Sequence, residues 1–312
     1  MTEAAALAVD LGGTHLRVAR VSPEGRILEV RREAHRDRSF EAVVGRIEAR
    51  LMELSESGPV SAVGVAVAAQ ILLPEGRVAV APNLGWRDVP LGTRLSERLP
   101  WPVKVMNDLS AYVCGERLAG AGRGCDDLFL LAVGSGVGSG ILCGGRLLEG
   151  ADGLAGEIGH VKVVPGGRLC GCGEHGCLEA YAGGHALAAI AGERIEAGAA
   201  GSAIREAAGD GPIEARHIAA AAEAGDPLAQ EILQEAAGYL GLAASWMVTV
   251  FNPRRLILGG GVLLGSPWLR ARVSSRTLEL AARPAGSRVA IHAALLGDDA
   301  GLIGAAAVAA GP

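Results

Sequence analysis

The stretch LAVDLGGTHLRVARV, residues 7–21, predicts the fold most directly. It begins as a short apolar strand that ends at Asp10, turns at two glycines, and continues as a second strand over residues 16–21. In P-loop and Rossmann folds a helix follows the glycines at once. Here a strand follows, and the Gly-Lys-Ser/Thr ending of the Walker motif is missing. The pattern therefore predicts a hairpin and disfavours both of those folds.

The same order of elements recurs in the middle of the chain. An apolar strand is expected over residues 128–133, the glycine-rich turn GSGVGSG follows at 134–140, and another strand is expected at 141–143. Glycine lets backbone N–H groups approach phosphate oxygens, and the hydroxyls of Thr14 and Ser135 could add donors. Hairpins also use glycine merely to turn, so neither motif decides alone. The weak repeat and the length of 312 residues predict two lobes.

Asn107 and Asp108 follow a strand expected over residues 103–106. Ligand sites in such sheets lie at the carboxyl ends of strands. Phosphoryl transfer to a hydroxyl requires a carboxylate that accepts the proton, and Asp108 fits this role. The alternative is that Asp108 only caps the helix that begins near Leu109.

Alanine-rich helices dominate residues 185–251, with Asp226 as an N-cap and Pro227 at the first helical position. The uncharged segment 236–251 is shorter than the roughly 18 to 20 apolar residues of a membrane span, so it is expected to be a buried helix. The remaining expected elements are helices at 40–54, 91–99 and 111–118, strands at 27–31, 62–68 and 256–258, a glycine loop at 259–261 and a final helix at 298–310.

Composition indicates a globular protein, with half of the residues hydrophobic and 20% charged. The net charge is −5, and a short arginine-rich patch between residues 31 and 38 is too small for a nucleic-acid face. The N-terminus lacks the basic start of an export signal. We therefore expect a cytoplasmic protein with no nucleic-acid or membrane partner.

Three of the six cysteines, Cys170, Cys172 and Cys177, crowd one glycine-rich loop. Three thiolates and one imidazole complete a tetrahedral zinc set and leave no position for water, so the metal would be structural. The fourth ligand is either His160 or His175.

Taken together, these segments resemble the ROK family of sugar kinases and related repressors, most closely its bacterial glucokinases. The matching segments are Asp10-Leu-Gly-Gly-Thr14-His-Leu-Arg17, Pro82-Asn83-Leu-Gly-Trp86, Asn107-Asp108, Gly134-Ser-Gly-Val-Gly138, Gly156-Glu-Ile-Gly-His160, the Cys170 to Glu179 loop, Gly259-Gly-Gly-Val262 and Gly297-Asp-Asp-Ala-Gly-Leu-Ile-Gly304.

The resemblance implies an α/β, two-lobed, actin-like ATPase (ribonuclease H-like) sugar kinase fold with a zinc-binding loop. The smaller lobe would comprise residues 1–119 with the C-terminal helix 298–312, and the larger lobe 120–297 would hold the nucleotide site and the zinc loop. The cofactors would be ATP with Mg²⁺ and a structural Zn²⁺. Homodimers or homotetramers are implied as well.

The resemblance also implies three sets of site residues. The nucleotide would contact Asp10, Gly12, Gly13, Thr14, Gly134, Ser135, Gly136, Gly260 and Gly261. The sugar would contact Asn83, Asn107, Asp108, Glu157, His160 and Glu179, with Asp108 as general base. Zinc would take His160, Cys170, Cys172 and Cys177, so that His160 places one ring nitrogen on zinc and the other on a sugar hydroxyl.

The expected reaction is phosphorylation of glucose to glucose 6-phosphate. The alternatives are a kinase for N-acetylglucosamine, N-acetylmannosamine or fructose, and a non-catalytic sugar-binding regulator. A repressor is disfavoured, because only nine residues precede Asp10 and leave no room for a helix-turn-helix. Near the sugar, Ala68-Ala69-Gln70-Ile71 replaces the family's usual Pro-Gly turn, and Ser135 stands where threonine is commoner.

Overall fold

The computed structural model describes residues 4–35 and 37–311 and divides the chain into two compact units. Unit 1 comprises Met1–Asp126, Gly140–Gly156 and Leu295–Pro312, and unit 2 comprises Asp127–Ser139 and Glu157–Ala294. Position 36 of the arginine-rich patch lies outside the described residues, as do residues 1–3 and 312 of the expected smaller lobe. The boundaries expected from the sequence stay a prediction.

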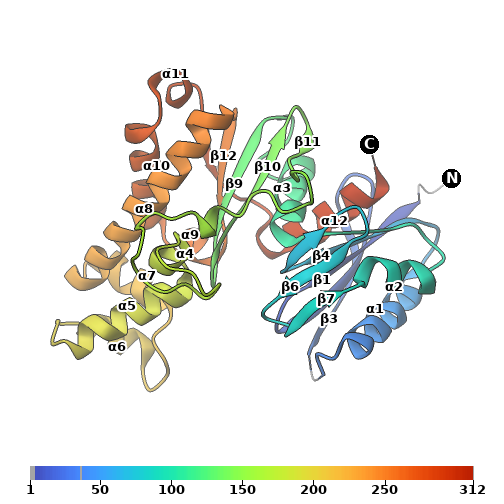
Figure 1. Ribbon diagram of the computed structural model, residues 1–312, viewed down its shortest axis with the longest axis horizontal. Coiled ribbons are helices and arrows are strands. Elements are labelled where there is room, and N and C mark those ends of the chain that lie inside the picture. The colour runs from blue at the N-terminus through green and yellow to red at the C-terminus, as the bar shows by residue number, and fades with distance from the viewer. Residues whose placement is uncertain (1–3, 36, 312) are drawn as a thin grey trace. The chain divides into compact units, whose positions relative to one another are not determined.

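Unit 1 contains a five-stranded sheet in the order β3-β2-β1-β4-β8 (Figure 1). The strands are β1 (Ala5–Leu11), β2 (His15–Val21), β3 (Ile27–Ala34), β4 (Val60–Val67) and β8 (Val103–Asn107). The first three form consecutive antiparallel hairpins, as expected, and β4 and β8 run parallel to β1. Leu11 pairs with Val67, which pairs with Asn107. The first glycine turn and Asp108 therefore lie at the same edge of this sheet.

Helices cover both faces of the unit 1 sheet (Figure 1). Each face of the sheet has its own hydrophobic core, because alternate residues of β1 point to opposite faces. Leu7 and Val9 pack with helix α1 (Phe40–Ser55) and helix α2 (Leu91–Arg98). Ala6 and Ala8 pack with the C-terminal helix α12 (Ala300–Ala310). Helix α3 (Asp108–Ala119) lies against α12. Small residues allow this close packing: a Cβ on Gly304 of α12 would meet the carbonyl oxygen of Ala111 in α3 at 1.7 Å.

A second sheet in unit 1 was not predicted. Strands β5 (Gln70–Leu72), β6 (Arg77–Ala81) and β7 (Trp86–Val89) form a three-stranded antiparallel sheet. The expected loop 68–71 is thus a two-residue turn followed by the start of β5. The connection between β6 and β7 carries Asn83.

Unit 2 is built on the parallel strands β9 (Leu128–Val133), β12 (Arg255–Gly259) and β13 (Ala290–Ala293). Strand β10 (Val137–Cys143) starts directly after Gly136, so the expectation of a turn that lasts to residue 140 was wrong. Strand β10 continues into unit 1 and pairs there with β11 (Arg146–Leu147). Because β9 and β12 are paired in parallel, Gly134 and Gly260 follow neighbouring strand ends.

The other helices of unit 2 are α4 (Glu179–Ala182), α5 (Gly184–Glu196), α6 (Ser202–Ala208), α7 (Ala215–Glu223), α8 (Pro227–Phe251), α9 (Gly261–Gly265), α10 (Pro267–Leu280) and α11 (Arg283–Gly286). The expected cap of α8 is confirmed, since Asp226 Oδ1 accepts from Ala229 N at 2.8 Å. The segment 236–251, expected to be a buried helix, forms the second half of α8 and buries one face, while Trp246 and Val250 are exposed.

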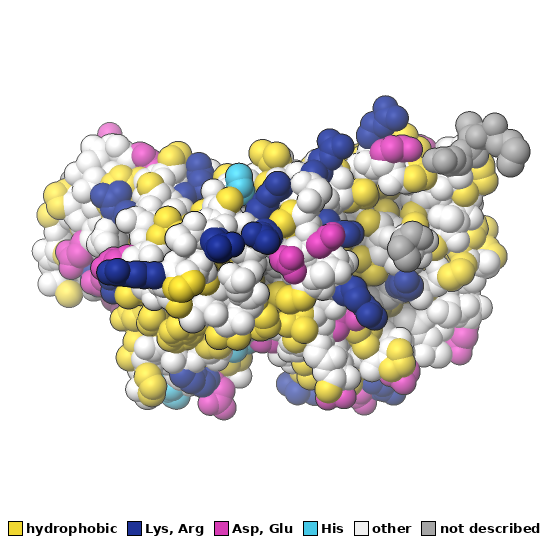
Figure 2. Space-filling model, turned by 90° about the horizontal axis from the view of Figure 1, so that it is seen from above, with side chains coloured by type: hydrophobic (Ala, Val, Ile, Leu, Met, Phe, Trp, Pro, Cys, Tyr) yellow, Lys and Arg dark blue, Asp and Glu magenta, His cyan; other side chains and the backbone are white. Residues whose placement is uncertain are grey.

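Short 3₁₀ turns occur at Ile158–His160 and Gly297–Asp299, and the latter delays the start of α12 by two residues relative to the prediction. On the face shown in Figure 2, Lys and Arg side chains are interspersed with acidic and uncharged ones. Among residues 4–35 and 37–311, no helix combines the length and apolar character that crossing a membrane requires.

Candidate functional site

The first glycine turn, residues 12–14, connects β1 to β2 and has an unusual hydrogen-bond arrangement. Two of its carbonyl oxygens face back into unit 1: His35 Nε2 lies 2.9 Å from Gly12 O, and His35 N donates to Thr14 O at 2.9 Å. In contrast, the N–H groups of Gly13 and Thr14 donate to no acceptor among the described residues. Successive uncommitted N–H groups form a concave site for an anion.

Asn83 lies directly against this turn. A Cβ on Gly13 would meet Asn83 Cβ at 2.5 Å, so only glycine fits beside that side chain. Arg38 Nη1 donates to Asn83 O at 3.2 Å, and Trp86 Nε1 donates to Arg38 O at 2.7 Å. The loop that carries Asn83 is therefore anchored beside the turn.

Asp10 precedes the turn and faces Arg17, with 3.6 Å between Asp10 Oδ2 and Arg17 Nη1. Arg17 also donates to the backbone oxygen of Asp298 and to the carboxylate of Asp299. Burial raises the pKa of Asp10, the guanidinium of Arg17 opposes this rise, and the charge of Asp298 adds to it. Arg17 thus connects the strand pair β1–β2 to the start of α12.

The second glycine turn, residues 134–136 in unit 2, repeats the arrangement of the first. Gly134 O and Ser135 O accept from the backbone N–H groups of Gly184 and His185 at the start of α5, at 2.9 and 3.0 Å. The N–H groups of Ser135 and Gly136 donate to no acceptor among the described residues. Each unit therefore contains one turn in which at least two carbonyl oxygens are held and two successive N–H groups are uncommitted.

Gly260 lies beside the second turn, at the end of the neighbouring strand β12. Its φ of 80° and the 2.4 Å that would separate a Cβ from Val133 O both require glycine. Gly261 begins the short helix α9.

Asn107, and not Asp108, caps helix α3. Asn107 Oδ1 accepts from Leu109 N at 2.8 Å and from Ser110 N at 3.3 Å, while its Nδ2 donates to Ala69 O at 3.0 Å. Asp108 is the first helical residue and is half-buried. The N-cap position is therefore taken by Asn107, although Asp108 Oδ1 also accepts from Leu109 N at 3.0 Å. Asn107 links the candidate base to the turn at residues 68–69.

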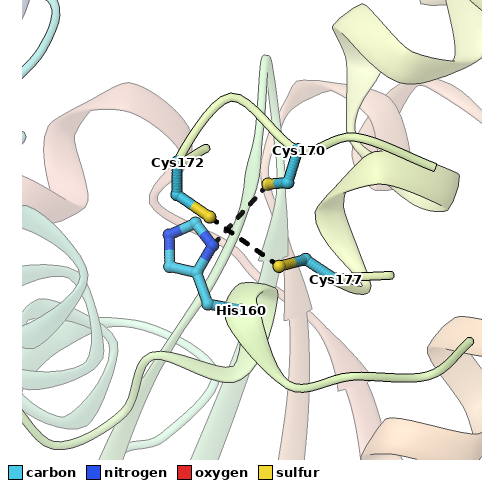
Figure 3. A group of neighbouring side chains, drawn as sticks. All are labelled: His160, Cys170, Cys172 and Cys177. Carbon is cyan, nitrogen blue, oxygen red and sulfur yellow. Dashed lines mark hydrogen bonds between the residues drawn. The ribbon is translucent and has the colours of Figure 1, made fainter. Parts of the chain in front are cut away.

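Three cysteines and one histidine converge in the loop of unit 2 (Figure 3). The ligand atoms of His160, Cys170, Cys172 and Cys177 all lie within 4.8 Å of one another. Cys172 Sγ and Cys177 Sγ are 3.8 Å apart, as are Cys170 Sγ and His160 Nδ1. Zn–S bonds of about 2.3 Å at the tetrahedral angle separate two sulfurs by about 3.8 Å. The four side chains therefore fit a structural zinc ion.

The structure decides between the two candidate histidines. His175 Nδ1 lies 2.9 Å from Gly167 O and is exposed, whereas His160 Nδ1 faces the sulfurs. Lys162, which the sequence analysis did not select, donates from Nζ to Cys177 Sγ at 3.1 Å. Its charge offsets part of the negative charge that three thiolates bring to a zinc site.

Of the three sugar candidates of unit 2, His160 belongs to this cluster, and Glu157 and Glu179 each lie beside one of its members. His160 Nε2, the nitrogen that does not face the sulfurs, lies 3.9 Å from Glu157 Oε2. Burial raises the pKa of Glu157, with His160 lowering it and Glu179 raising it to smaller extents. Glu179 Oε1 lies 3.7 Å from Cys170 Sγ. The other three candidates, Asn83, Asn107 and Asp108, belong to unit 1.

Two residues of unit 1 were missed as supports of the site. Arg17 belongs to the quoted motif but had no assigned role, and His35 lies outside every motif. Gly12 is 23 positions from His35, and Asp298 and Asp299 are more than 280 positions from Arg17, so no local pattern could indicate these contacts.

Comparison with known proteins places this geometry in a family. The sequence model of the protein family described as "ROK family" matches residues 6–311 of this chain. The chain belongs to the ROK family. Among its relatives, the glucokinase of Streptomyces coelicolor is 35% identical, over 98% of each chain. The N-acetylmannosamine kinase of Citrobacter koseri is also 35% identical, again over 98% of each chain.

Among solved ROK structures, the glucokinase of Streptomyces griseus in complex with glucose and AMPPNP is similar with a TM-score of 0.84. It is 36% identical, and the alignment covers 98% of this chain and 99% of that one. The actin-like ROK kinase fold expected from the sequence is thereby confirmed.

Proposed function

We propose that this ROK protein transfers the terminal phosphoryl group of ATP to a hexose, glucose in the first place, and so forms glucose 6-phosphate. The observation that carries the proposal is the matched pair of glycine turns. In each turn at least two carbonyl oxygens are held by groups of the same unit and two successive N–H groups are uncommitted, which suits the oxygens of a nucleotide's phosphates. The S. griseus relative was solved with glucose and an ATP analogue, which supports the same pair of substrates here.

Asp108 would act as general base on the sugar hydroxyl. Phosphoryl transfer depends mainly on positioning and on neutralising charge, and the protein contributes a carboxylate that accepts the proton of the attacking oxygen. Asn107 caps α3 and so fixes the backbone that carries Asp108. Mg²⁺ bound together with ATP would supply positive charge that neutralises the charge developing on the phosphates.

Glu157, His160 and Glu179 would bind the sugar hydroxyls. Zinc on Nδ1 would leave His160 Nε2 to contact a hydroxyl, and it would hold the loop from which Glu179 follows Cys177 by two residues. Nucleotide contacts are proposed for Asp10, Gly12, Gly13, Thr14, Gly134, Ser135, Gly136, Gly260 and Gly261, and sugar contacts in unit 1 for Asn83, Asn107 and Asp108.

A kinase for N-acetylmannosamine is the second candidate, because the C. koseri relative is as similar in sequence as the S. coelicolor glucokinase. The turn at residues 68–69, which lacks the usual Pro-Gly pair, is tied to Asn107 and would shape the pocket. N-acetylglucosamine and fructose are further alternatives.

A coupled ADP-release assay across glucose, mannose, fructose, N-acetylglucosamine and N-acetylmannosamine tests the proposal. We expect the highest kcat/KM with glucose. Preference for an N-acetyl sugar would overturn the glucose assignment and leave the kinase assignment in place. Sugar binding without turnover of any of the five would instead indicate a non-catalytic regulator.

We also propose that the protein acts in the cytoplasm, without a nucleic-acid partner, as a homodimer or homotetramer. Size-exclusion chromatography with light scattering would measure the mass of the protein in solution. Comparison with the 31.6 kDa of one chain gives the number of subunits.

A further inference from the structure

His35 contacts the first glycine turn, and none of the roles proposed above accounts for this contact. It follows β3, is half-buried, and touches the first glycine turn through both its backbone and its ring. We propose that His35 is a positioning residue that orients the Gly12–Gly13 peptide so that its N–H faces the nucleotide's phosphates. The inference rests on the proposed ATP-dependent function.

The planarity of the peptide bond carries the first step. In a trans peptide the C=O of one residue and the N–H of the next point in opposite directions. Because the ring of His35 holds Gly12 O at 2.9 Å, the N–H of Gly13 must point away from His35. That N–H is one of the two uncommitted donors of the turn. The side chain of His35 therefore sets the direction of a phosphate-facing donor.

Arg46 in α1 fixes the protonation of the ring. Arg46 Nη2 lies 3.2 Å from His35 Nδ1, and a guanidinium can only donate, so Nδ1 is the acceptor and Nε2 carries the proton that Gly12 O accepts. Burial lowers the pKa of His35, the Gly12 carbonyl opposes this, and Arg46 and Arg38 lower it further. The ring is accordingly neutral and in the tautomer that donates to the turn.

The second turn explains why a side chain is needed here. In unit 2, helix α5 supplies backbone N–H groups that hold the carbonyls of Gly134 and Ser135. In unit 1, strand β2 follows the turn in sequence, and no helix start binds Gly12 O among the described residues. The ring of His35 thus holds a carbonyl oxygen of the first turn, as the start of α5 holds carbonyl oxygens of the second turn.

The test compares three variants with the wild type. His35→Ala removes the donor to Gly12 O, His35→Gln keeps an amide donor of similar reach, and Arg46→Met removes the partner that fixes the tautomer. Arg50→Met is the matched control, because Arg50 also lies on α1 and pairs with Glu33, as Arg46 does, while its ion pairs and hydrogen bonds are with Glu33 and Glu53. The measurements are the affinity for ATP with Mg²⁺ by titration calorimetry without sugar, the KM for ATP and for glucose, and the melting temperature.

The loss of one hydrogen bond corresponds to roughly a 3- to 10-fold change in a dissociation constant. We expect His35→Ala to weaken ATP affinity and raise the KM for ATP by about that factor, with the KM for glucose unchanged. His35→Gln should retain most of the wild-type ATP affinity. Arg46→Met should weaken ATP affinity less than His35→Ala does, and Arg50→Met should match the wild type. Unchanged ATP affinity in His35→Ala would overturn the inference. It would also be overturned if the KM for ATP and the KM for glucose rose equally and Arg50→Met showed the same rise. A wild type that binds ATP normally but phosphorylates no hexose would overturn the proposed function and leave this inference standing.

Discussion

Glu179 Oε2 accepts a hydrogen bond from the backbone N–H of Val137 at 2.9 Å. The other oxygen of the same carboxylate lies near Cys170 of the metal cluster, and Val137 is the first residue after the second glycine turn. A Cβ on Gly159 would meet Val137 O at 2.0 Å, so the segment that carries Glu157 and His160 packs against the same residue. Within unit 2, the metal loop, the sugar candidates and the nucleotide turn therefore share one junction.

Gly136→Ala should weaken the binding of both substrates. A Cβ at this position would meet Glu179 Oε2 at 2.1 Å, so the carboxylate must move from the Val137 N–H. We expect the KM for glucose and the KM for ATP each to rise at least about 10-fold, which corresponds to the loss of one charge-assisted hydrogen bond. Steady-state kinetics measure both constants. Gly192→Ala, on α5 with open space around it, is the control and should behave as the wild type. A rise in the KM for ATP alone would contradict the shared junction.

Zinc removal should raise the KM for glucose and expose three thiols. With metal bound we expect the exposed Cys143 to react with a thiol reagent, while burial holds the pKa of Cys114 at about 12 and Cys125 is buried. Chelation should add Cys170, Cys172 and Cys177 to the reactive set, counted by mass spectrometry. Loss of zinc with unchanged sugar kinetics in Cys172→Ser would show that the metal does not support the sugar site.

Arg17→Met should move the acid limb of the pH profile. Burial already raises the pKa of Asp10, and the guanidinium of Arg17 counteracts that rise. Asp10 is a carboxylate only above its pKa, so removing Arg17 raises the pKa further and shifts the acid limb of kcat/KM for ATP to higher pH. Arg26→Met, which removes an exposed arginine 4.0 Å from Glu24, is the control. An acid limb at the same pH in Arg17→Met and wild type would contradict this account of Asp10.

Glu116→Ala should destabilise unit 1. The buried carboxylate of Glu116 accepts from Ala121 N at 2.7 Å, Leu295 N at 3.0 Å and Leu296 N at 2.9 Å. Truncation leaves three backbone N–H groups without this acceptor, so we expect a loss of about 3 kcal/mol or more in the free energy of unfolding. Thermal unfolding measures the change, and Glu196→Ala, an exposed position on α5, should change little. Equal melting temperatures for the two variants would contradict the role of Glu116.

The parts of the fold that short-range patterns determine could be predicted. The hairpin over residues 7–21, the three cysteine ligands of the zinc site and the Asp226 cap each depend on a few neighbouring residues whose chemistry indicates their structure. The β5–β7 sheet, the support of the first turn by His35 and the anchoring by Glu116 depend on partners distant in sequence. Asn107 and Asp108 are an intermediate case, because both residues are good N-caps and only the start of α3 decides between them.

The most direct test of the central claim is the rate of Asp108→Asn with saturating glucose and ATP. Asparagine keeps the size of the side chain and cannot accept the proton, so the account predicts that kcat falls by roughly 10²- to 10⁴-fold while the affinity for glucose changes little. A variant that binds glucose normally and phosphorylates it as fast as the wild type would contradict the assignment of Asp108 as the base.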